Sequence, residues 1–215
     1  NHWPEDQRYV SALTSLATST DAVGDKPGSE ARYRELLASI QRIHKPPHDA
    51  IAKAMRNLAL IIFRSEKFEE AENLLNQALD MQRKILGDDH PEVAATYAAF
   101  GAVWAEQRRF AEADSAYRSA IAICDRTGLR EEVCPRAHNN LGMSLYRQDR
   151  LDEAKAEMML ALAGRRALFG DDHPTVAYSL STLANVAGKQ NDSAGALKLS
   201  GEALAVLERG GRGAS

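Results

Sequence analysis

The 215-residue sequence has few of the features that mark membrane-spanning or disulfide-rich proteins. Its richest apolar run, residues 59–63, is bracketed by Arg56 and Arg64 and falls far short of the roughly 18 apolar residues that a membrane span needs. The two cysteines, Cys124 and Cys134, are too few for a disulfide framework. They lie close enough in sequence to approach each other, but we expect two small, half-buried side chains in a reducing compartment. These absences predict a cytoplasmic protein without a membrane segment.

The sequence also has no charged-then-apolar leader at its start and does not begin with Met, so we expect a fragment or processed form of a longer chain. A formal net charge of −3 gives no general attraction to nucleic acid. Hydrophobic residues make up 44% and charged residues 27%, a balance that is typical of a folded domain and not of a disordered one.

Catalytic signatures are missing as well. The sequence contains no G-x-S-x-G motif, no phosphate-binding Gly-rich loop and no H-E-x-x-H motif. The six histidines are scattered, and we expect the one inside a repeat helix, His138, to be packed or hydrogen-bonded. Although folding can bring acid–base pairs together from distant positions, the sequence favours a protein that is not an enzyme and carries no cofactor.

What the sequence does contain is a repeat. Residues 86–91, Leu-Gly-Asp-Asp-His-Pro, return almost unchanged at 169–174, which is 83 positions later. Glu-Ala pairs at 70–71, 112–113 and 153–154 divide this interval into steps of 42 and 41. A fourth alanine, Ala196, follows 42 positions after Ala154, and a small residue stands twelve positions before each of the four alanines, at Ala59, Gly101, Gly142 and Ala184. A fixed period of this length is typical of stacked helical repeats.

The pattern predicts an all-α fold, a right-handed superhelical solenoid of antiparallel helix pairs with about ten helices. Residues 1–47 form a degenerate first pair, with a helix over 3–20, a loop over 21–29 and a second helix ending at Ile43. Four repeats follow, over 48–90, 91–132, 133–173 and 174–209, and residues 210–215 form a flexible tail. The first helices of these repeats are expected near 48–64, 91–107, 133–148 and 174–189. The second helices are expected near 67–86, 110–126, 151–168 and 192–209.

The repeat resembles a known family. The residues Tyr97, Phe100, Gly101 and Trp104, with Ala113, Tyr117 and Ala120 after them, follow the tetratricopeptide pattern. The period of 41 or 42 exceeds the usual 34, and a unit that ends in L-G-D-D-H-P is similar to the repeats of kinesin light chains and related bacterial tetratricopeptide proteins. The resemblance covers roughly residues 48–209. It implies a solenoid whose first helices face a concave groove, and it implies protein or peptide binding.

The groove positions can be counted from the small residue of each repeat. Six of the side chains there are basic, and Glu106 is the one acid. Asparagines would bond the backbone of an extended ligand, arginines would pair with its carboxylates, and alanines would leave room for an apolar side chain. We therefore predict a basic groove for an extended acidic segment of a protein partner, against the alternative that solvated bases fall there by chance. The predicted peptide-binding residues are Lys53, Arg56, Asn57, Phe63, Arg64, Ala98, Ala102, Arg136, Asn139, Asn140, Met143, Tyr146, Arg147, Asn185 and Lys189.

The Gly-Asp-Asp-His-Pro element has two interpretations. Its carboxylates and imidazole are possible metal ligands. As a joint between helices, Gly87 and Gly170 would take the left-handed C-terminal cap, the aspartates would bond free N–H groups, and Pro91 and Pro174 would begin the next helix. Because the element recurs as a joint would, we favour the structural interpretation and predict no metal site.

Other functional classes stay open. The chain could be a regulatory or sensor domain that controls an attached effector, which flanking sequence would reveal. It could also be a self-assembly module, a possible homo-oligomer, which concentration-dependent mass would reveal. RNA binding is the weakest alternative, because the groove has few aromatics and the net charge is negative.

Overall fold

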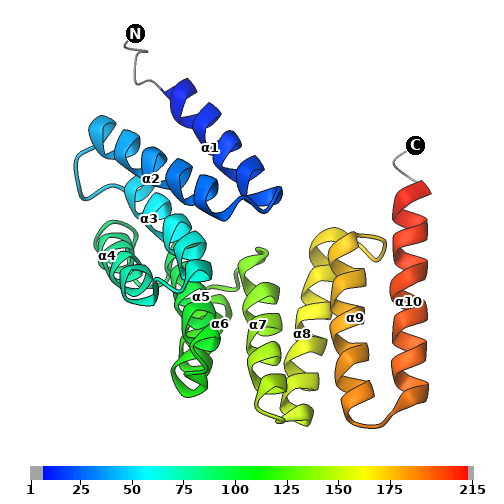
Figure 1. Ribbon diagram of the computed structural model, residues 1–215. Helices are drawn as coiled ribbons and strands as arrows, with labels where there is room; N and C mark the ends of the chain where they lie inside the picture. Colours follow the sequence, from blue (N-terminus) through cyan, green and yellow to red (C-terminus); the bar gives the residue numbers. More distant parts are fainter. Residues whose placement is uncertain (1–6, 213–215) are drawn as a thin grey trace. The chain divides into compact units, whose positions relative to one another are not determined.

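The computed structural model describes residues 7–212, and this part of the chain contains ten α-helices, one short 3₁₀ helix and no strand (Figure 1). The chain divides into two compact units, residues 1–103 and 104–215, and each is described by itself. The predicted all-α fold of antiparallel helix pairs is confirmed. Residues 3–6, which the sequence places in the first helix, lie outside the described part.

The first unit consists of two helix pairs and the start of a third. Helix α1 packs on α2, α2 on α3, and α3 on α4. Buried apolar side chains on both members of each pair form the core between them, as with Leu58 on α3 and Leu75 on α4. The elements are α1 (Gln7–Ala22), α2 (Lys26–Ile43), α3 (Asp49–Ile62), the 3₁₀ helix η1 (Phe63–Ser65), α4 (Phe68–Leu86) and most of α5 (Pro91–Glu106).

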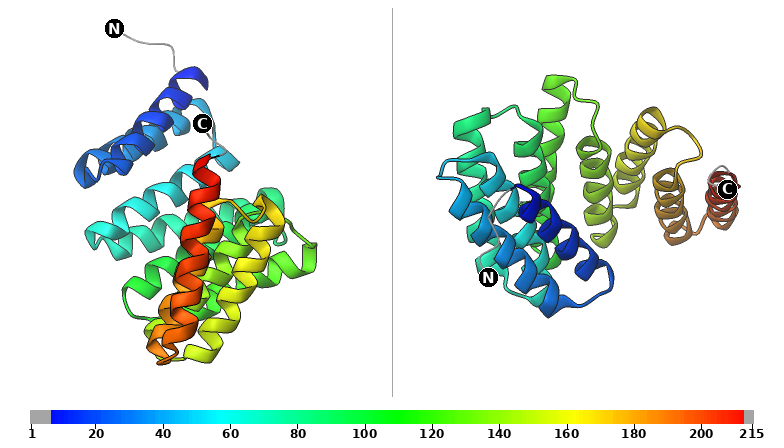
Figure 2. Two further views of the ribbon diagram at one scale, coloured as in Figure 1. Left: turned by 90° about the vertical axis from the view of Figure 1, so that its right-hand side faces the viewer. Right: turned by 90° about the horizontal axis from the view of Figure 1, so that it is seen from above.

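The second unit begins with the last residues of α5 and continues with five helices. Helices α7 to α10 stand side by side and alternate in direction, so that each packs on the one before it (Figures 1 and 2). Helix α6 packs on α7. The elements are α6 (Phe110–Thr127), α7 (Val133–Arg147), α8 (Leu151–Phe169), α9 (Pro174–Lys189) and α10 (Ser193–Arg212).

The predicted helix bounds in the four repeats agree with the structure to within a few residues, because the turns recur with the period of the sequence. In each of these four repeats, the turn between the two helices contains one non-glycine residue with a φ near 60°. This left-handed residue is disfavoured for L-amino acids but ends one helix and redirects the chain within three residues. These residues are Glu66, Arg108, Asp149 and Asn191.

The loop predicted over 21–29 is much shorter in the structure. Helix α2 already begins at Lys26, because the Asp25 carboxylate accepts a hydrogen bond from the Gly28 N–H at 3.0 Å and caps the helix. Pro27, read from the sequence as a loop residue, lies in the first turn, where a helix tolerates proline.

The tail predicted from residue 210 is also partly wrong, because α10 continues to Arg212. Its last turn is held against the turn between α8 and α9. Arg209 Nε donates to Asp172 Oδ1 at 2.6 Å, and a Cβ added at Gly210 would lie only 2.7 Å from the Asp172 carbonyl oxygen. The glycine thus allows a close approach instead of ending the helix.

The two cysteines form a disulfide between the end of α6 and the start of α7, so the expectation of reduced thiols was wrong. The turn that brings them together is set by Gly128, whose φ of 62° is left-handed, and by a hydrogen bond from the Leu129 N–H to the Cys124 carbonyl. As a result the Cα atoms of Cys124 and Cys134 lie 5.9 Å apart. Disulfides persist mainly in oxidising compartments, so the cysteines no longer support the expected cytoplasmic location.

Across residues 7–212, every helix is too short or too polar to cross a lipid bilayer.

The two helices of the α7–α8 pair cross most closely at Gly142, as the repeat pattern predicted. A Cβ at this position would lie 3.1 Å from the Ala154 carbonyl oxygen and 2.7 Å from Met158 Cγ on α8. Both facing residues are fully buried. The space for a side chain at residue 142 is therefore taken by the neighbouring helix.

We expect Gly142→Leu to lower the free energy of unfolding by about 1–3 kcal/mol, because the larger side chain forces α7 and α8 apart. Urea unfolding followed by circular dichroism would measure the change. The matched control is Gly201→Leu on α10, where nothing lies within 4 Å of an added Cβ. Equal stability of the Gly142 variant and the wild type would show that this crossing does not limit packing.

Candidate functional site

The predicted peptide-binding residues all lie on odd-numbered helices or, as with Arg64, just after one. In the first unit they are on α3, η1 and α5, and in the second unit on α7 and α9. Most are exposed or half-buried, as a binding surface requires. Two are not: Ala98 is 4% exposed and Asn139 is 2% exposed, so the expectation that they line an open groove was wrong.

In the first unit, two of the predicted basic residues share one carboxylate. Glu92, in the first turn of α5, lies 2.5 Å from Arg56 Nη1 and 3.2 Å from Lys53 Nζ on α3. Lys53 also pairs with Asp49 one turn before it on the same helix, at 2.8 Å. Burial alone would raise the pKa of Glu92, but the hydrogen bond and charge of Arg56, with those of Lys53, outweigh burial and lower it.

Arg64, the third predicted groove base of the first unit, is also paired with a carboxylate. Arg64 Nη1, at the end of the α3–η1 segment, lies 2.9 Å from Asp21 Oδ1 on α1. These ion pairs join consecutive helix pairs inside the unit, so the first unit presents little uncompensated positive charge on this face.

In the second unit, two predicted site residues come together where α7 and α9 end. The Lys189 Nζ donates to the Tyr146 carbonyl oxygen at 3.2 Å, lies 4.5 Å from the Tyr146 ring centroid, and pairs with Asp149 at 2.5 Å. Arg147 pairs with Glu106 at 3.4 Å. The amide of Asn139 is buried, and its Oδ1 has no hydrogen-bond partner.

The expected contrast of six bases against the single acid Glu106 was therefore wrong. Apart from Glu106, the neutralising acids lie in the first or last turns of helices and in a turn between helices, which a count along one helical face leaves out. Five of the six bases are ion-paired: Lys53, Arg56, Arg64, Arg147 and Lys189. The sixth, Arg136 on α7, is exposed and has no carboxylate within ion-pair distance among the described residues.

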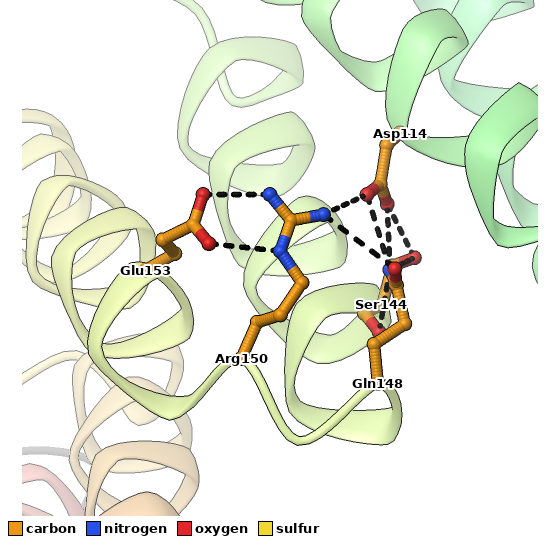
Figure 3. Close-up of polar contacts among 5 residues, drawn as sticks. All are labelled: Asp114, Ser144, Gln148, Arg150 and Glu153. Atoms are coloured by element: carbon orange, nitrogen blue, oxygen red, sulfur yellow. Dashed lines mark hydrogen bonds and ion pairs between the residues drawn. The ribbon is translucent and has the colours of Figure 1, made fainter.

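A buried polar cluster that sequence reasoning missed joins α6 to α7 and to the turn after it (Figure 3). Asp114, 7% exposed, accepts hydrogen bonds from Ser144 Oγ at 2.6 Å and from Gln148 Nε2 at 3.1 Å. Arg150 completes the cluster by pairing with Asp114 at 3.2 Å and with Glu153 at 2.7 Å. The sequence signal was an aspartate in a helix interior, where this residue type is disfavoured unless its carboxylate is bonded.

This cluster borders a surface pocket of about 580 Å³ that is lined by α6 and Arg150. Its floor is formed by small side chains, and its charged groups are already engaged in the cluster or exposed to solvent. The pocket is lined by Ala111, Asp114, Ser115, Arg118, Ser119, Ala122 and Arg150. Because the carboxylate of Asp114 is fully engaged with its neighbours, we interpret the cluster as structural.

The histidines of the recurring joints act as helix caps. The Nδ1 atoms of His48, His90 and His173 each accept a hydrogen bond from the backbone N–H two residues later, at 3.1–3.2 Å. A ring nitrogen engaged in this way satisfies a free amide at the start of the next helix. In the described part of the chain, no group of three or more histidine, cysteine or carboxylate side chains is placed to hold a metal ion.

The glycines and first aspartates of the joints also have defined roles. Gly87 and Gly170 have positive φ angles of 82° but extended ψ angles, a conformation that is essentially restricted to glycine. Asp88 and Asp171 pair with the arginine five residues before each, instead of capping the next helix as expected. Histidine therefore takes the capping role that we assigned to aspartate.

Comparison with known proteins identifies the repeat. The family model for the tetratricopeptide repeat matches residues 9–84, 50–126 and 134–209. The first match includes the helix pair that looked degenerate in the sequence. No curated protein sequence matches the chain significantly.

Solved structures with the same fold include kinesin-light-chain-like proteins. BtubC (BKLC) from P. vanneervenii is 24% identical with a TM-score of 0.68, and the alignment covers 94% of this chain and 78% of that one. A putative kinesin light chain of Podosopora anserina with nearly identical TPR-like repeats is 19% identical with a TM-score of 0.72, covering 98% and 100%. At these identities the likeness establishes the fold.

A third similar structure is a Rap protein. The Rap conjugation gene regulator of the plasmid pLS20, in complex with the Phr* peptide, is 13% identical with a TM-score of 0.75. The alignment covers 90% of this chain but only 52% of the Rap protein, so the chain spans about half of its length.

We expect Glu92→Gln to destabilise the protein most near neutral pH. The pKa of Glu92 is lowered by folding, so its ionised form stabilises the fold above its ordinary pKa, and that contribution is lost as the pH falls through the lowered value. The difference in unfolding free energy between wild type and variant should therefore shrink between neutral pH and a pH below 4.5. Urea titrations across this range would measure it, and a difference that does not change with pH would contradict the role of the Arg56 pair.

We expect Asp114→Ala to lower the free energy of unfolding by about 2–3 kcal/mol, because it leaves Ser144 and Gln148 without their acceptor. Ser115→Ala, at the next position of α6 and in the same pocket, is the matched control and should be close to neutral. Equal effects of the two substitutions on the urea midpoint would show that the cluster does not hold α6 to α7.

Proposed function

The chain belongs to the tetratricopeptide repeat family, and from this premise we propose that it is a protein-interaction scaffold that binds an extended, acidic segment of a partner. Repeats of this kind stack into elongated surfaces on which first helices present side chains to a ligand. The proposal assigns the binding role to α7 and α9 of the second unit.

The observation that carries the proposal is the charge of Arg136. Its guanidinium lies on the exposed side of α7 with no carboxylate partner among the described residues, whereas the other five predicted bases are compensated locally. An arginine in this state retains its capacity to pair with a ligand carboxylate through two parallel hydrogen bonds.

The surroundings of Arg136 suit an extended peptide. Asn140 on α7 is half-buried and Asn185 on α9 is exposed, and neither amide makes a hydrogen bond to the described residues. Such amides can donate to and accept from a peptide backbone. Met143 and Tyr178 add apolar surface beside them, one half-buried and one exposed. This mixture of amides, apolar groups and one free cation supports an acidic and extended ligand.

The Rap structure gives fold-level support, because a protein of similar architecture is seen with the Phr* peptide. The proposed role needs neither catalysis nor a cofactor, in keeping with a sequence that carries no catalytic motif.

A peptide array tests the proposal. The purified protein should retain short peptides rich in Asp and Glu in preference to versions in which these residues are replaced by Asn and Gln. Arg136→Glu should weaken binding of the acidic peptides by about tenfold, because it places a like charge against them.

The matched control is Arg118→Glu, which makes the same charge change at an exposed position of α6, and which should bind as the wild type does. No preference for acidic peptides, or equal losses in both variants, would contradict the proposal.

A further inference from the structure

Helix α8 contains a buried arginine that the predicted groove did not include. Arg165 is 5% exposed, and its Nη1 donates to Ser179 Oγ on α9 at 2.6 Å and, more weakly, to the Thr175 carbonyl oxygen at 3.4 Å. The guanidinium carbon lies 5.3 Å from the ring centroid of Tyr178. All contacts of this guanidinium are thus with neutral groups of α9.

The charge of Arg165 is not compensated by an ion pair. No carboxylate of the described residues lies within ion-pair distance of it, and the nearest influence of that kind, Glu132, acts from farther away. Its buried Nε has no hydrogen-bond partner. Burial is the main cause that lowers the pKa of Arg165; Tyr178 and Glu132 act in the opposite direction without outweighing it, and the like charge of Arg136 adds to the lowering. A buried cation without a counter-charge is costly, so its retention calls for an explanation.

The repeat shows that packing does not need the charge. The residue 83 positions earlier is Gln82, which is also fully buried, and its Oε1 accepts a hydrogen bond from the Thr96 hydroxyl at 2.6 Å. Thr96 in turn stands 83 positions before Ser179. In the first unit, a neutral amide on α4 therefore bonds a hydroxyl on α5, just as the arginine on α8 bonds a hydroxyl on α9.

The second uncompensated arginine lies close enough to matter. Arg136 follows Pro135, and Arg165 follows Gly164; a Cβ added at Gly164 would lie only 3.1 Å from the Pro135 Cβ, so α7 and α8 bring the two arginines close together. In keeping with this placement, the charge of Arg136 acts to lower the pKa of Arg165. Tyr178, whose ring contacts the Arg165 guanidinium, is 52% exposed, so its side chain extends from the buried arginine to the solvent. Two neighbouring arginines without an ion-paired acid among the described residues form a local positive charge in a protein whose net charge is −3.

We propose that Arg165 and Arg136 together form a binding site for a carboxylate of the bound segment, with Tyr178 at its entrance. This inference rests on the proposed function and names the contact that selects an acidic ligand. A planar carboxylate accepts paired hydrogen bonds from a guanidinium, and its charge would supply the counter-ion that Arg165 lacks. Arg136 draws the acidic segment in from the solvent, and Arg165 fixes one carboxylate beside the Tyr178 ring.

The variant that tests the site is Arg165→Gln, which copies the native Gln82 of the first unit. It keeps an amide that can bond Ser179, removes the charge and shortens the side chain, as in the native link of the first unit. We expect its melting temperature to equal or exceed that of the wild type, because an unpaired buried charge is removed. We expect its affinity for a fluorescein-labelled acidic peptide retained on the array, measured by anisotropy, to fall by at least about tenfold.

Two ligand controls locate the contact. Replacing each Glu or Asp of the labelled peptide in turn should reveal one position whose loss matters in the wild type and not in Arg165→Gln. An amidated C-terminus tests whether that carboxylate is instead the terminal one. Competition by inorganic phosphate as effective as that by glutarate would overturn the assignment to a carboxylate. Arg118→Gln, an exposed arginine on α6, should leave every affinity unchanged.

The outcomes separate this inference from the proposed function. If the wild type and Arg165→Gln bind acidic peptides equally, the arginine site is wrong and the scaffold proposal stands. If the wild type binds no acidic peptide, the scaffold proposal fails, and nuclear magnetic resonance of the Arg165 Nε–H during a glutarate titration decides the site by itself. A shift of that signal that saturates supports an anion site, and no shift overturns it.

Discussion

Where α7 crosses α8, Gly142 faces the Ala154 carbonyl oxygen and the Met158 side chain with no room for a β-carbon. This close approach sets the distance between the two helices and, with it, the positions of the side chains on the outer side of α7. Fully buried alanines, Ala59 and Ala71, stand at the matching points of α3 and α4. Small residues at the crossings thus allow the two helices of each pair to pack closely in a thin layer. One face of the first helix in the pair remains exposed to solvent.

The proposed binding surface depends on how charge is distributed over these layers. Most bases on the first helices are held by acids that begin the next first helix or end a neighbouring one, so these charges stabilise the stack and leave little for a ligand. Arg136 and Arg165 differ because no acid of the described residues lies within ion-pair distance of them. In the function that we propose for this acidic protein, specificity for an acidic ligand would come from two particular arginines and not from a generally basic groove.

The sequence was sufficient to predict the helix bounds and the small residues at the crossings, because both recur with the period and depend on local backbone chemistry. The charge balance of the surface could not be predicted in the same way. Glu92 pairs with Arg56 across 36 positions, and Asp21 with Arg64 across 43, so the pairing depends on how one helix pair stacks on the next. A count along one helix omits these partners.

Arg165 was missed for a related reason: its position in the repeat is a packing position, occupied by Gln82 one full interval earlier. Only the contacts show that its charge lacks a partner. The histidine caps, in contrast, were within reach of the sequence, since His48 precedes His90 by 42 residues and each begins a helix.

The disulfide between Cys124 and Cys134 joins the end of α6 to the start of α7, beside the turn that Gly128 makes possible. Helix ends are where local opening starts in stacked repeats, because they have the fewest buried contacts. Here the two ends are linked covalently, so neither can fray without the other, and opening at this joint requires both helix ends to open together. The first turn of α7, which carries Arg136, is consequently a fixed platform rather than a loose end.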